Sequence, residues 1–131
     1  MARIINKEQL LGYGDIEVKE LLLDLLLRGL EDVDPYKAIK KVISRGNNSI
    51  KVGGKTLHVH GKIYVLGLGK ASCSMAKAIE EILGDLIEDG VVVTKYGYSI
   101  PLEKIRVIEA GHPIPDVNSL KAGYEAFKLF K

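Results

Sequence analysis

The sequence predicts an α/β fold in which a parallel sheet is built from strands that alternate with helices. Three short apolar runs, at residues 62–66, 91–94 and 105–108, read as buried strands. A helical pattern of apolar residues separates the first two runs, and another helical pattern follows the third. Strands that alternate with helices in this way imply parallel pairing and right-handed crossovers.

Two helices are expected before that sheet. The first should cover residues 16–30, because Asp15 suits the N-cap position and leucines fill most of the segment. With leucine on nearly every side, we expect neighbouring structure to cover most of this helix. The second should begin at Asp34-Pro35, where a capping residue precedes a proline at the first helical position, and should end at Gly46.

A glycine pair predicts a hairpin between these helices and the sheet. Gly53-Gly54 separates residues 49–52 from residues 55–59, and such a pair tolerates the positive φ angles of a two-residue turn.

The helix after the first sheet strand should end at Gly84, and the last helix should cover residues 120–131. Each is expected to pack through one apolar face. The residues expected to face inward are Ala71, Met75, Ala78, Ile79 and Ile82 on the first of these helices, and Leu120, Tyr124, Phe127 and Leu129 or Phe130 on the second.

Composition is that of an ordinary globular domain. The 131 residues are 47% apolar and 27% charged, and the net charge of +2 comes without a basic, aromatic-rich stripe of the kind that binds nucleic acid. The longest apolar stretch, residues 21–30, contains two charges and is too short to span a membrane. The N-terminus has no apolar leader, so we expect a cytoplasmic protein. A single cysteine, Cys73, excludes an internal disulfide and a multi-thiolate metal site.

The predicted sheet is thin, and the chain stops inside an apolar helical pattern. We therefore expect the chain to be a piece of something larger. A sheet edge left exposed in such a piece favours self-association, so a homo-oligomer is also expected.

The turn Gly67-Leu68-Gly69-Lys70, between the first strand and the next helix, carries the most chemical information. Its glycines allow a sharp turn and let a ligand approach the main chain. The helix start beyond it offers unpaired N–H groups and a partial positive charge, which favour phosphate. A lysine there opposes the helix dipole at a cost of roughly 0.3–1 kcal/mol, and a bound anion reverses that sign. We therefore expect Lys70 to meet a phosphate; the alternative is a solvated lysine.

The turn does not complete either of two familiar nucleotide motifs. Ser72, or Cys73 in the alternative spacing, stands at the third glycine of a dinucleotide fingerprint, and Thr94-Lys95 stands where an NAD site has an acid. The Walker A pattern is absent as well. Residue types alone therefore define no more than a phosphate or a phosphorylated ligand.

Other candidates follow strands that end at the same sheet edge. His112, in a loop stiffened by two prolines, either bonds a phosphate, carries a proton or bonds to nearby backbone. Thr94, Lys95 and Gly97 should face the same cleft, where Lys95 is either a second anion contact or solvated. Asp116 either touches a substrate or a metal, or caps the last helix.

Three motifs follow one another at natural spacing. They are Gly67-Leu68-Gly69-Lys70-Ala71 followed by Met75-Ala76, then Gly-Val-Val-Val-Thr-Lys-Tyr-Gly at residues 90–97, then Glu-Ala-Gly-His-Pro-Ile-Pro-Asp at residues 109–116. Together they resemble the N-terminal part of the glycerate 2-kinases that carry a MOFRL domain, from about residue 16 to the end of the chain.

The resemblance implies ATP-dependent phosphorylation of D-glycerate to 2-phosphoglycerate, with ATP and Mg²⁺ as cofactors. It implies a Rossmann-like three-layer α/β/α domain, of which residues 1–131 are the N-terminal portion, with the active site in a cleft toward a second domain. The family's catalytic lysine matches Lys70. Family members also carry a serine- and glycine-rich phosphate loop and a second-domain arginine that this sequence lacks. The expected substrate- and phosphate-binding residues are Gly67, Gly69, Ser72, Lys95, His112 and Asp116, with no metal ligand among them.

Three alternatives stay open. The first is a sugar-phosphate isomerase, although Ala71 stands where such domains have serine. The second is an NADP-dependent hydroxypyruvate reductase in which Lys95 takes the 2′-phosphate. The third is an inactive fragment that only binds phosphate.

Overall fold

The computed structural model describes residues 3–131, which form a parallel sheet, a small antiparallel sheet and the helices around them. The helices are α1 (Lys7–Leu11), α2 (Ile16–Asp32), α3 (Pro35–Val42), α4 (Ser72–Leu83) and α5 (Val117–Lys128), with a 3₁₀ turn at Gly84–Leu86. The strands are β1 (Ile43–Gly46), β2 (Ser49–Val52), β3 (Lys55–His58), β4 (Ile63–Leu68), β5 (Ile87–Lys95) and β6 (Ile105–Ala110).

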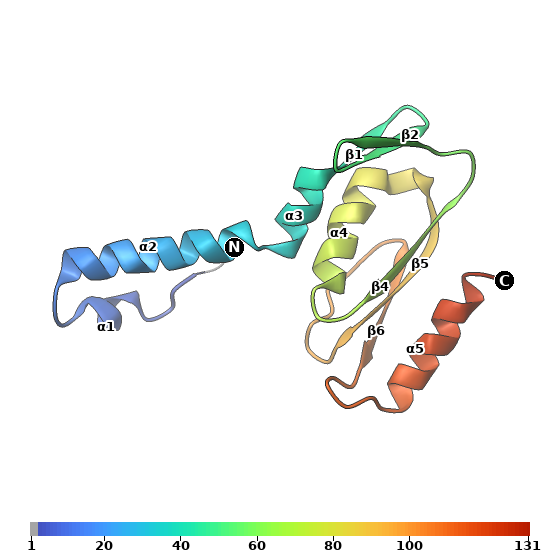
Figure 1. Cartoon of the computed structure of the whole chain (residues 1–131). Coiled ribbons are helices and arrows are strands. Elements are labelled where there is room, and N and C mark those ends of the chain that lie inside the picture. The colour runs from blue at the N-terminus through green and yellow to red at the C-terminus, as the bar shows by residue number, and fades with distance from the viewer. Residues whose placement is uncertain (1–2) are drawn as a thin grey trace.

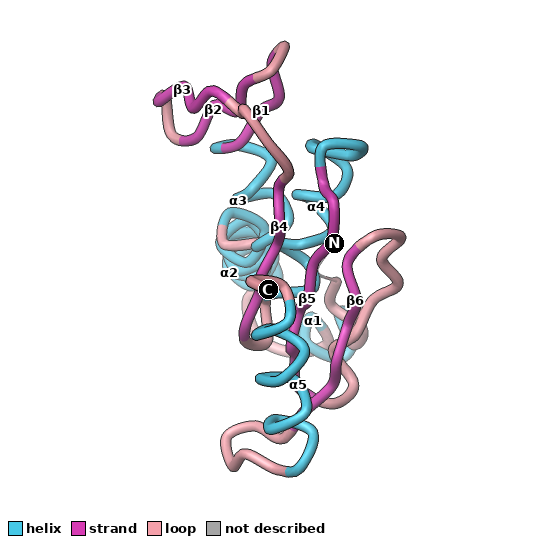
Figure 2. The backbone as a smooth tube through the Cα atoms, turned by 90° about the vertical axis from the view of Figure 1, so that its right-hand side faces the viewer, coloured by secondary structure: helices cyan, strands magenta, loops and turns pink. Residues whose placement is uncertain are grey.

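The parallel sheet has the strand order β4-β5-β6, so β5 is its central strand. α4 covers one face of this sheet and α5 lies on the other (Figures 1 and 2). This three-layer arrangement confirms the predicted α/β fold with a parallel sheet. The carboxyl ends of all three strands point toward the same edge, which is where the candidate residues of the sequence are placed.

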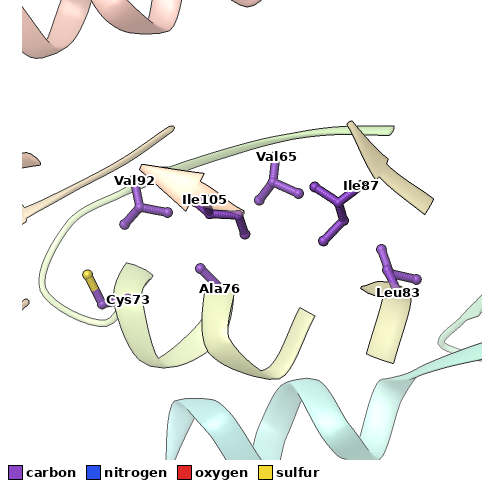
Figure 3. Packing of buried hydrophobic residues seen from close by; sticks show 7 residues of the cluster. All are labelled: Val65, Cys73, Ala76, Leu83, Ile87, Val92 and Ile105. Carbon is purple, nitrogen blue, oxygen red and sulfur yellow. The ribbon is translucent and has the colours of Figure 1, made fainter. Parts of the chain in front are cut away.

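The core lies between the sheet and α4. Side chains from β4, β5 and β6 meet those of α4 in a continuous apolar cluster (Figure 3). Cys73 belongs to it with 1% of its surface exposed and no disulfide. Gly90 on β5 permits the close strand spacing, because a Cβ there would lie 2.9 Å from the carbonyl oxygen of Val65. The cluster consists of Val65, Cys73, Ala76, Leu83, Ile87, Val92 and Ile105.

Aspartates begin three of the longer helices. Asp15, Asp34 and Asp116 each accept a hydrogen bond from the backbone N–H three residues ahead, at 3.1, 2.9 and 3.0 Å. These caps confirm the predicted starts of α2 and α3, and they give Asp116 the capping role considered for it. α4 differs, because it begins at Ser72 with no side-chain cap at all.

The predicted end of the second helix is wrong. α3 stops at Val42, and residues 43–46 form β1, which pairs with β2 of the predicted hairpin. Ile43 is β-branched and lies opposite Val52. This cross-strand pairing stabilises a strand here more than one further helical turn would stabilise α3. Gly46 instead makes room at the β1–β2 turn, since a Cβ there would lie 2.6 Å from the Ser49 hydroxyl.

The predicted inward face of the last helix is wrong as well, apart from Leu129. α5 buries Ala122, whose small side chain lets the helix backbone approach the sheet, and Leu129 directly after the helix is buried too. Glu125 also turns toward the sheet, where it pairs with Arg106 at 2.6 Å. The large apolar residues that were expected inside are 66–77% exposed, namely Leu120, Tyr124, Phe127 and Phe130.

On α4 the predicted face is confirmed for Ala78, Ile79 and Ile82, whereas Ala71 and Met75 are exposed. Cys73, Ala76 and Leu83 supply the contacts to the sheet, together with the half-buried Ile79 and Ile82. Ala78 is buried as expected. Gly84 ends the helix with φ +51°, as predicted.

α2 extends away from the sheet, accompanied mainly by α1 (Figure 1). The Lys19 ammonium donates to the carbonyl of Leu10 at 2.8 Å and ties the two helices together. None of the α2 residues is buried, so the expected covering of its leucines is not found among residues 3–131. No helix within residues 3–131 combines the length and the apolar character that crossing a membrane would take.

The exposed leucines of α2 should drive association between copies of the chain, because contiguous apolar surface of this kind is rare on monomers. Replacing Leu25 by Glu should raise the concentration needed for association at least about tenfold, the equivalent of 1.4 kcal/mol. Leu57→Glu on β3 is the matched control, because both leucines are 56% exposed. Light scattering across a dilution series measures the effect, and a monomeric unsubstituted chain would contradict it.

Glu80 on α4 anchors the segment that leads into β6. Its carboxylate accepts hydrogen bonds from the backbone N–H groups of Glu103, Lys104 and Ile105 at 2.9, 2.6 and 3.1 Å. Partial burial works to raise the pKa of the Glu80 carboxyl, but these three donors outweigh it, and the pKa lies below its ordinary value.

Glu80→Ala should lower the free energy of unfolding by about 1–3 kcal/mol at pH 7, because it leaves backbone donors without an acceptor. Since the folded pKa is lowered, the stabilisation is present above the unfolded pKa and is lost as the pH falls through the folded value. Urea unfolding should therefore show a difference in the free energy of unfolding between the unsubstituted chain and Glu80→Ala that narrows from pH 7 toward pH 3. Glu103→Ala is the control, and a difference that did not change with pH would refute this account.

Candidate functional site

The carboxyl ends of β4, β5 and β6 enclose a pocket of about 110 Å³. Four residues predicted for the site line it: Gly69, Lys70, Lys95 and His112. The other three predicted residues, which are described below, are not part of its lining. The complete lining is Gly69, Lys70, Val93, Thr94, Lys95, Ala110, Gly111, His112 and Ser119.

The turn between β4 and α4 is shaped by Gly69. Its φ of +104° lies in a region that side chains disfavour, and the space where a Cβ would stand is open. The Gly69 N–H donates to the carbonyl of Val93 at 2.9 Å, which ties the turn to β5. The main chain is therefore bare and accessible at this point, as a close ligand approach requires.

Lys70 follows directly, in the two-residue step before α4 begins. Its side chain makes no hydrogen bond and no salt bridge to any other residue of the described part of the chain, 3–131, and it is exposed. α4 has no side-chain cap, so its first N–H groups and its dipole add positive potential to that of the ammonium.

Gly67 and Ser72 hold α4 against the sheet instead of lining the pocket. A Cβ on Gly67 would lie 2.9 Å from a methyl group of Val92 and 3.3 Å from the Cβ of Ser72, so only glycine fits. The Ser72 hydroxyl is buried and lies 2.5 Å from the carbonyl oxygen of Gly69 and 3.1 Å from that of Val93. Both residues shape the turn that presents Lys70.

Thr94 is the polar residue of the pocket lining that is most deeply buried. It is 2% exposed, and its hydroxyl has no hydrogen-bond partner among the described residues. A buried hydroxyl left unpaired costs about 1–3 kcal/mol. Such unpaired groups concentrate where a ligand or ordered water completes the bonding. The sequence placed Thr94 at this edge, but nothing in its pattern singled out the orphaned hydroxyl.

Asp116 is fully engaged by protein donors. One carboxylate oxygen accepts from the Ser119 N–H at 3.0 Å and the other from the Tyr96 hydroxyl at 2.6 Å. The Tyr96 hydrogen bond, followed by one from the Gly111 N–H, lowers the pKa of the Asp116 carboxyl to about 2. The carboxylate is thus used in the helix cap, and substrate contact by Asp116 stays a prediction.

Sequence reasoning missed two residues that support the site. Glu109 accepts from the Gly97 N–H and the Ser99 hydroxyl, both at 2.8 Å, and so fixes the loop after β5. Tyr96 joins that loop to Asp116 in the loop after β6. The signal for Glu109 was its position beside Thr94 in the sheet register, which requires the pairing to be known.

The chemistry available here is anion binding. Lys70 and Lys95 are cationic, His112 can donate a hydrogen bond, and the dipole of α4, which begins just after Lys70, adds positive potential. Within residues 3–131 no group of three or more His, Cys, Asp or Glu side chains is arranged to hold a metal ion. A volume of about 110 Å³ is small beside the roughly 300–1,000 Å³ of ordinary ligand pockets. It suits one phosphate or carboxylate group.

Comparison with known families decides the relationship. The family described as "Domain of unknown function (DUF4147)" matches residues 21–131. The chain belongs to this family.

Two of three similar proteins carry names that agree with the resemblance, and the third carries a different one. A Pyrococcus horikoshii protein named glycerate 2-kinase is 46% identical over 114 residues, which are 87% of this chain and 26% of the relative. A Thermotoga maritima D-glycerate 2-kinase is 34% identical over 113 residues, covering 86% and 24%. An Agrobacterium vitis protein named putative hydroxypyruvate reductase is 30% identical over 115 residues, covering 88% and 24%.

Solved structures agree with the fold. A crystal structure of a Pyrococcus horikoshii protein, 46% identical, superposes with a TM-score of 0.77 over 86% of this chain and 25% of its own. The crystal structure of Thermotoga maritima glycerate kinase, 31% identical, superposes with a TM-score of 0.69 over 88% of this chain and 25% of its own. The predicted resemblance to the glycerate 2-kinase family is confirmed. The present chain spans about a quarter of the length of these relatives.

Proposed function

We propose that this chain is the N-terminal portion of a domain that phosphorylates D-glycerate to 2-phosphoglycerate with ATP, and that Lys70 is its catalytic cation. The observation that carries the proposal is an ammonium group without a hydrogen-bond or ion-pair partner among residues 3–131, in the lining of a small pocket and beside a helix start that has no side-chain cap. The names of the Pyrococcus and Thermotoga relatives support the choice of glycerate as acceptor.

Electrostatics favour a phosphoryl group at this corner. Phosphoryl transfer spreads negative charge over the moving oxygens, and catalysis consists largely of positioning and of stabilising that charge. Lys70, Lys95 and the N-terminus of α4 all contribute positive potential at the pocket. The carboxylates nearby, Glu109 and Asp116, stay charged, but their oxygens are occupied by protein donors.

In the proposed reaction the 2-hydroxyl oxygen of glycerate bonds to the γ-phosphorus of ATP while the bond from that phosphorus to the bridging oxygen of ADP breaks. The hydroxyl proton passes to a base, for which His112 is the candidate in this chain. Lys70 would hold the γ-phosphoryl oxygens, and the bare main chain at Gly69 would let them approach α4. Mg²⁺ would be bound through the nucleotide phosphates, because the carboxylates of this corner are already occupied.

The pocket offers room for one phosphate-sized group, so the nucleotide base, the ribose and part of the acceptor site belong to other segments. This requirement agrees with the length of the relatives, of which the chain covers about a quarter. We accordingly propose that turnover needs those segments.

Lys70→Ala should lower kcat/KM for glycerate by at least about 10²-fold, the usual loss when a preorganised donor to a transition state is removed. The substitution is made in a chimera in which this chain replaces the matched region of the Pyrococcus relative, and ADP release is measured. Lys77→Ala is the matched control, because Lys77 is an exposed lysine of α4 that faces Glu81 at 3.8 Å. Near-normal turnover of Lys70→Ala would end the proposed role. An unsubstituted chimera that turns over nothing would favour the phosphate-binding fragment.

A second candidate function is the NADP-dependent reduction of hydroxypyruvate, which the name of the Agrobacterium relative favours. The turn argues against it, because the third glycine of a dinucleotide fingerprint is replaced by the buried Ser72. We expect no loss of absorbance at 340 nm when the chimera is mixed with NADPH and hydroxypyruvate. A loss that Lys95→Ala abolished and Lys77→Ala did not would favour the reductase.

A further inference from the structure

The loop that carries His112 has few contacts of its own. His112, Pro113, Ile114 and Pro115 are all exposed, and Ile114 has 80% of its surface in solvent. The loop nevertheless lines the same pocket as Lys70. Something outside the loop must therefore keep His112 in place.

The restraint runs through the carboxylate of Asp116. Asp116 accepts a hydrogen bond from the N–H of Ser119 at the start of α5, and its carboxyl group packs against Gly111, the residue before His112. Gly111 has no room for a side chain, since a Cβ would lie 2.4 Å from the Ile114 carbonyl oxygen and 3.2 Å from the carboxyl carbon of Asp116. The two ends of the loop are thus closed onto one carboxylate.

Tyr96 connects this closed loop to the neighbouring strand. Its hydroxyl donates to Asp116 at 2.6 Å and accepts from the side-chain amide of Asn118 at 2.9 Å. Asn118 also donates to the carbonyl of Glu109 at 3.3 Å, so the tyrosine oxygen is held from two sides. Tyr96 directly follows Lys95, which lines the pocket.

We propose that Tyr96 is a positioning residue, which fixes His112 and Lys95 at a set separation across the anion pocket by bonding the loop after β5 to the Asp116 carboxylate. The inference rests on the proposed function, because the ligand it concerns is the phosphoryl group at Lys70. Tyr96 touches no ligand itself; it acts through Asp116 and Gly111 on the geometry of the pocket.

Tyr98 provides a matched control two residues away. Both tyrosines are about half exposed, at 46% and 50%, and they lie in the same loop. The ring of Tyr98 lies 5.4 Å from the Lys95 ammonium, a contact that phenylalanine would keep. Within residues 3–131, the Tyr98 hydroxyl makes no hydrogen bond comparable to that of Tyr96. Each Tyr→Phe change therefore deletes one oxygen, but only one deletion cuts the link.

The full chain is titrated with inorganic phosphate, and the NMR chemical shift of the His112 ring is measured at each step. The ring signals are readily assigned because the chain has three histidines. We expect Tyr96→Phe to require about tenfold more phosphate for the same shift, a change worth 1.4 kcal/mol. Tyr98→Phe should titrate like the unsubstituted chain. Amide hydrogen exchange at Gly111 should quicken several-fold in Tyr96→Phe alone, while urea unfolding of the two variants stays alike.

Asn118→Leu is a second variant, which leaves Tyr96 intact but removes the amide that orients its hydroxyl, and we expect an intermediate weakening. Tyr96→Phe and Tyr98→Phe with the same phosphate affinity and the same Gly111 exchange would overturn the positioning role. Failure of the proposed function has a different signature, in which Lys70→Ala leaves the phosphate titration unchanged. In that event faster Gly111 exchange in Tyr96→Phe would still support the link, and unchanged exchange would refute it.

Discussion

The close approach of α4 to β4 and β5 is the constraint on which the candidate site depends. It is possible only because Gly67 has no side chain where Val92 and Ser72 meet it, and because Ser72 satisfies its buried hydroxyl on two carbonyl oxygens. Once the helix start is fixed there, the positive φ of Gly69 turns the chain so that Lys70 emerges at the pocket. A larger residue at position 67 would move the helix and the ammonium together.

Much of the fold follows from local signals in the sequence. Capping aspartates, the Gly53-Gly54 turn and Gly84 set helix starts, the hairpin and a helix end as expected. The errors arise where tertiary pairing competes with local preference. Position 43 joined a strand because β2 offered it a partner. α5 packs on the sheet through Ala122 rather than Phe127, because the small alanine side chain lets the helix backbone lie close to the sheet.

The site divides in a similar way. Position along the chain was enough to bring Lys70, Lys95 and His112 to one edge, since parallel strands end together. Which polar side chains bond to the protein itself depends on side-chain geometry, and the spacing of residues in the sequence does not determine that geometry. Ser72 and Asp116 have the residue types of ligand contacts, yet the structure directs their oxygens to backbone and to Tyr96. Thr94 shows the reverse, because a residue inside a valine strand retains an unpaired hydroxyl.

These assignments explain how the corner keeps its positive character. Two carboxylates, that of Glu109 near the end of β6 and that of Asp116 at the cap of α5, bond to the loop that follows Lys95, and free carboxylates there would oppose an anion. Hydrogen bonds from Ser99 and backbone N–H groups lower the pKa of the Glu109 carboxyl below its ordinary value, so its charge is kept but is spent on protein donors. The same bonds that occupy these carboxylate oxygens also hold the loops together. The lysines are therefore left as the unpaired charges facing the pocket, and it is this separation of paired acids from unpaired bases that suits the corner to a phosphoryl group.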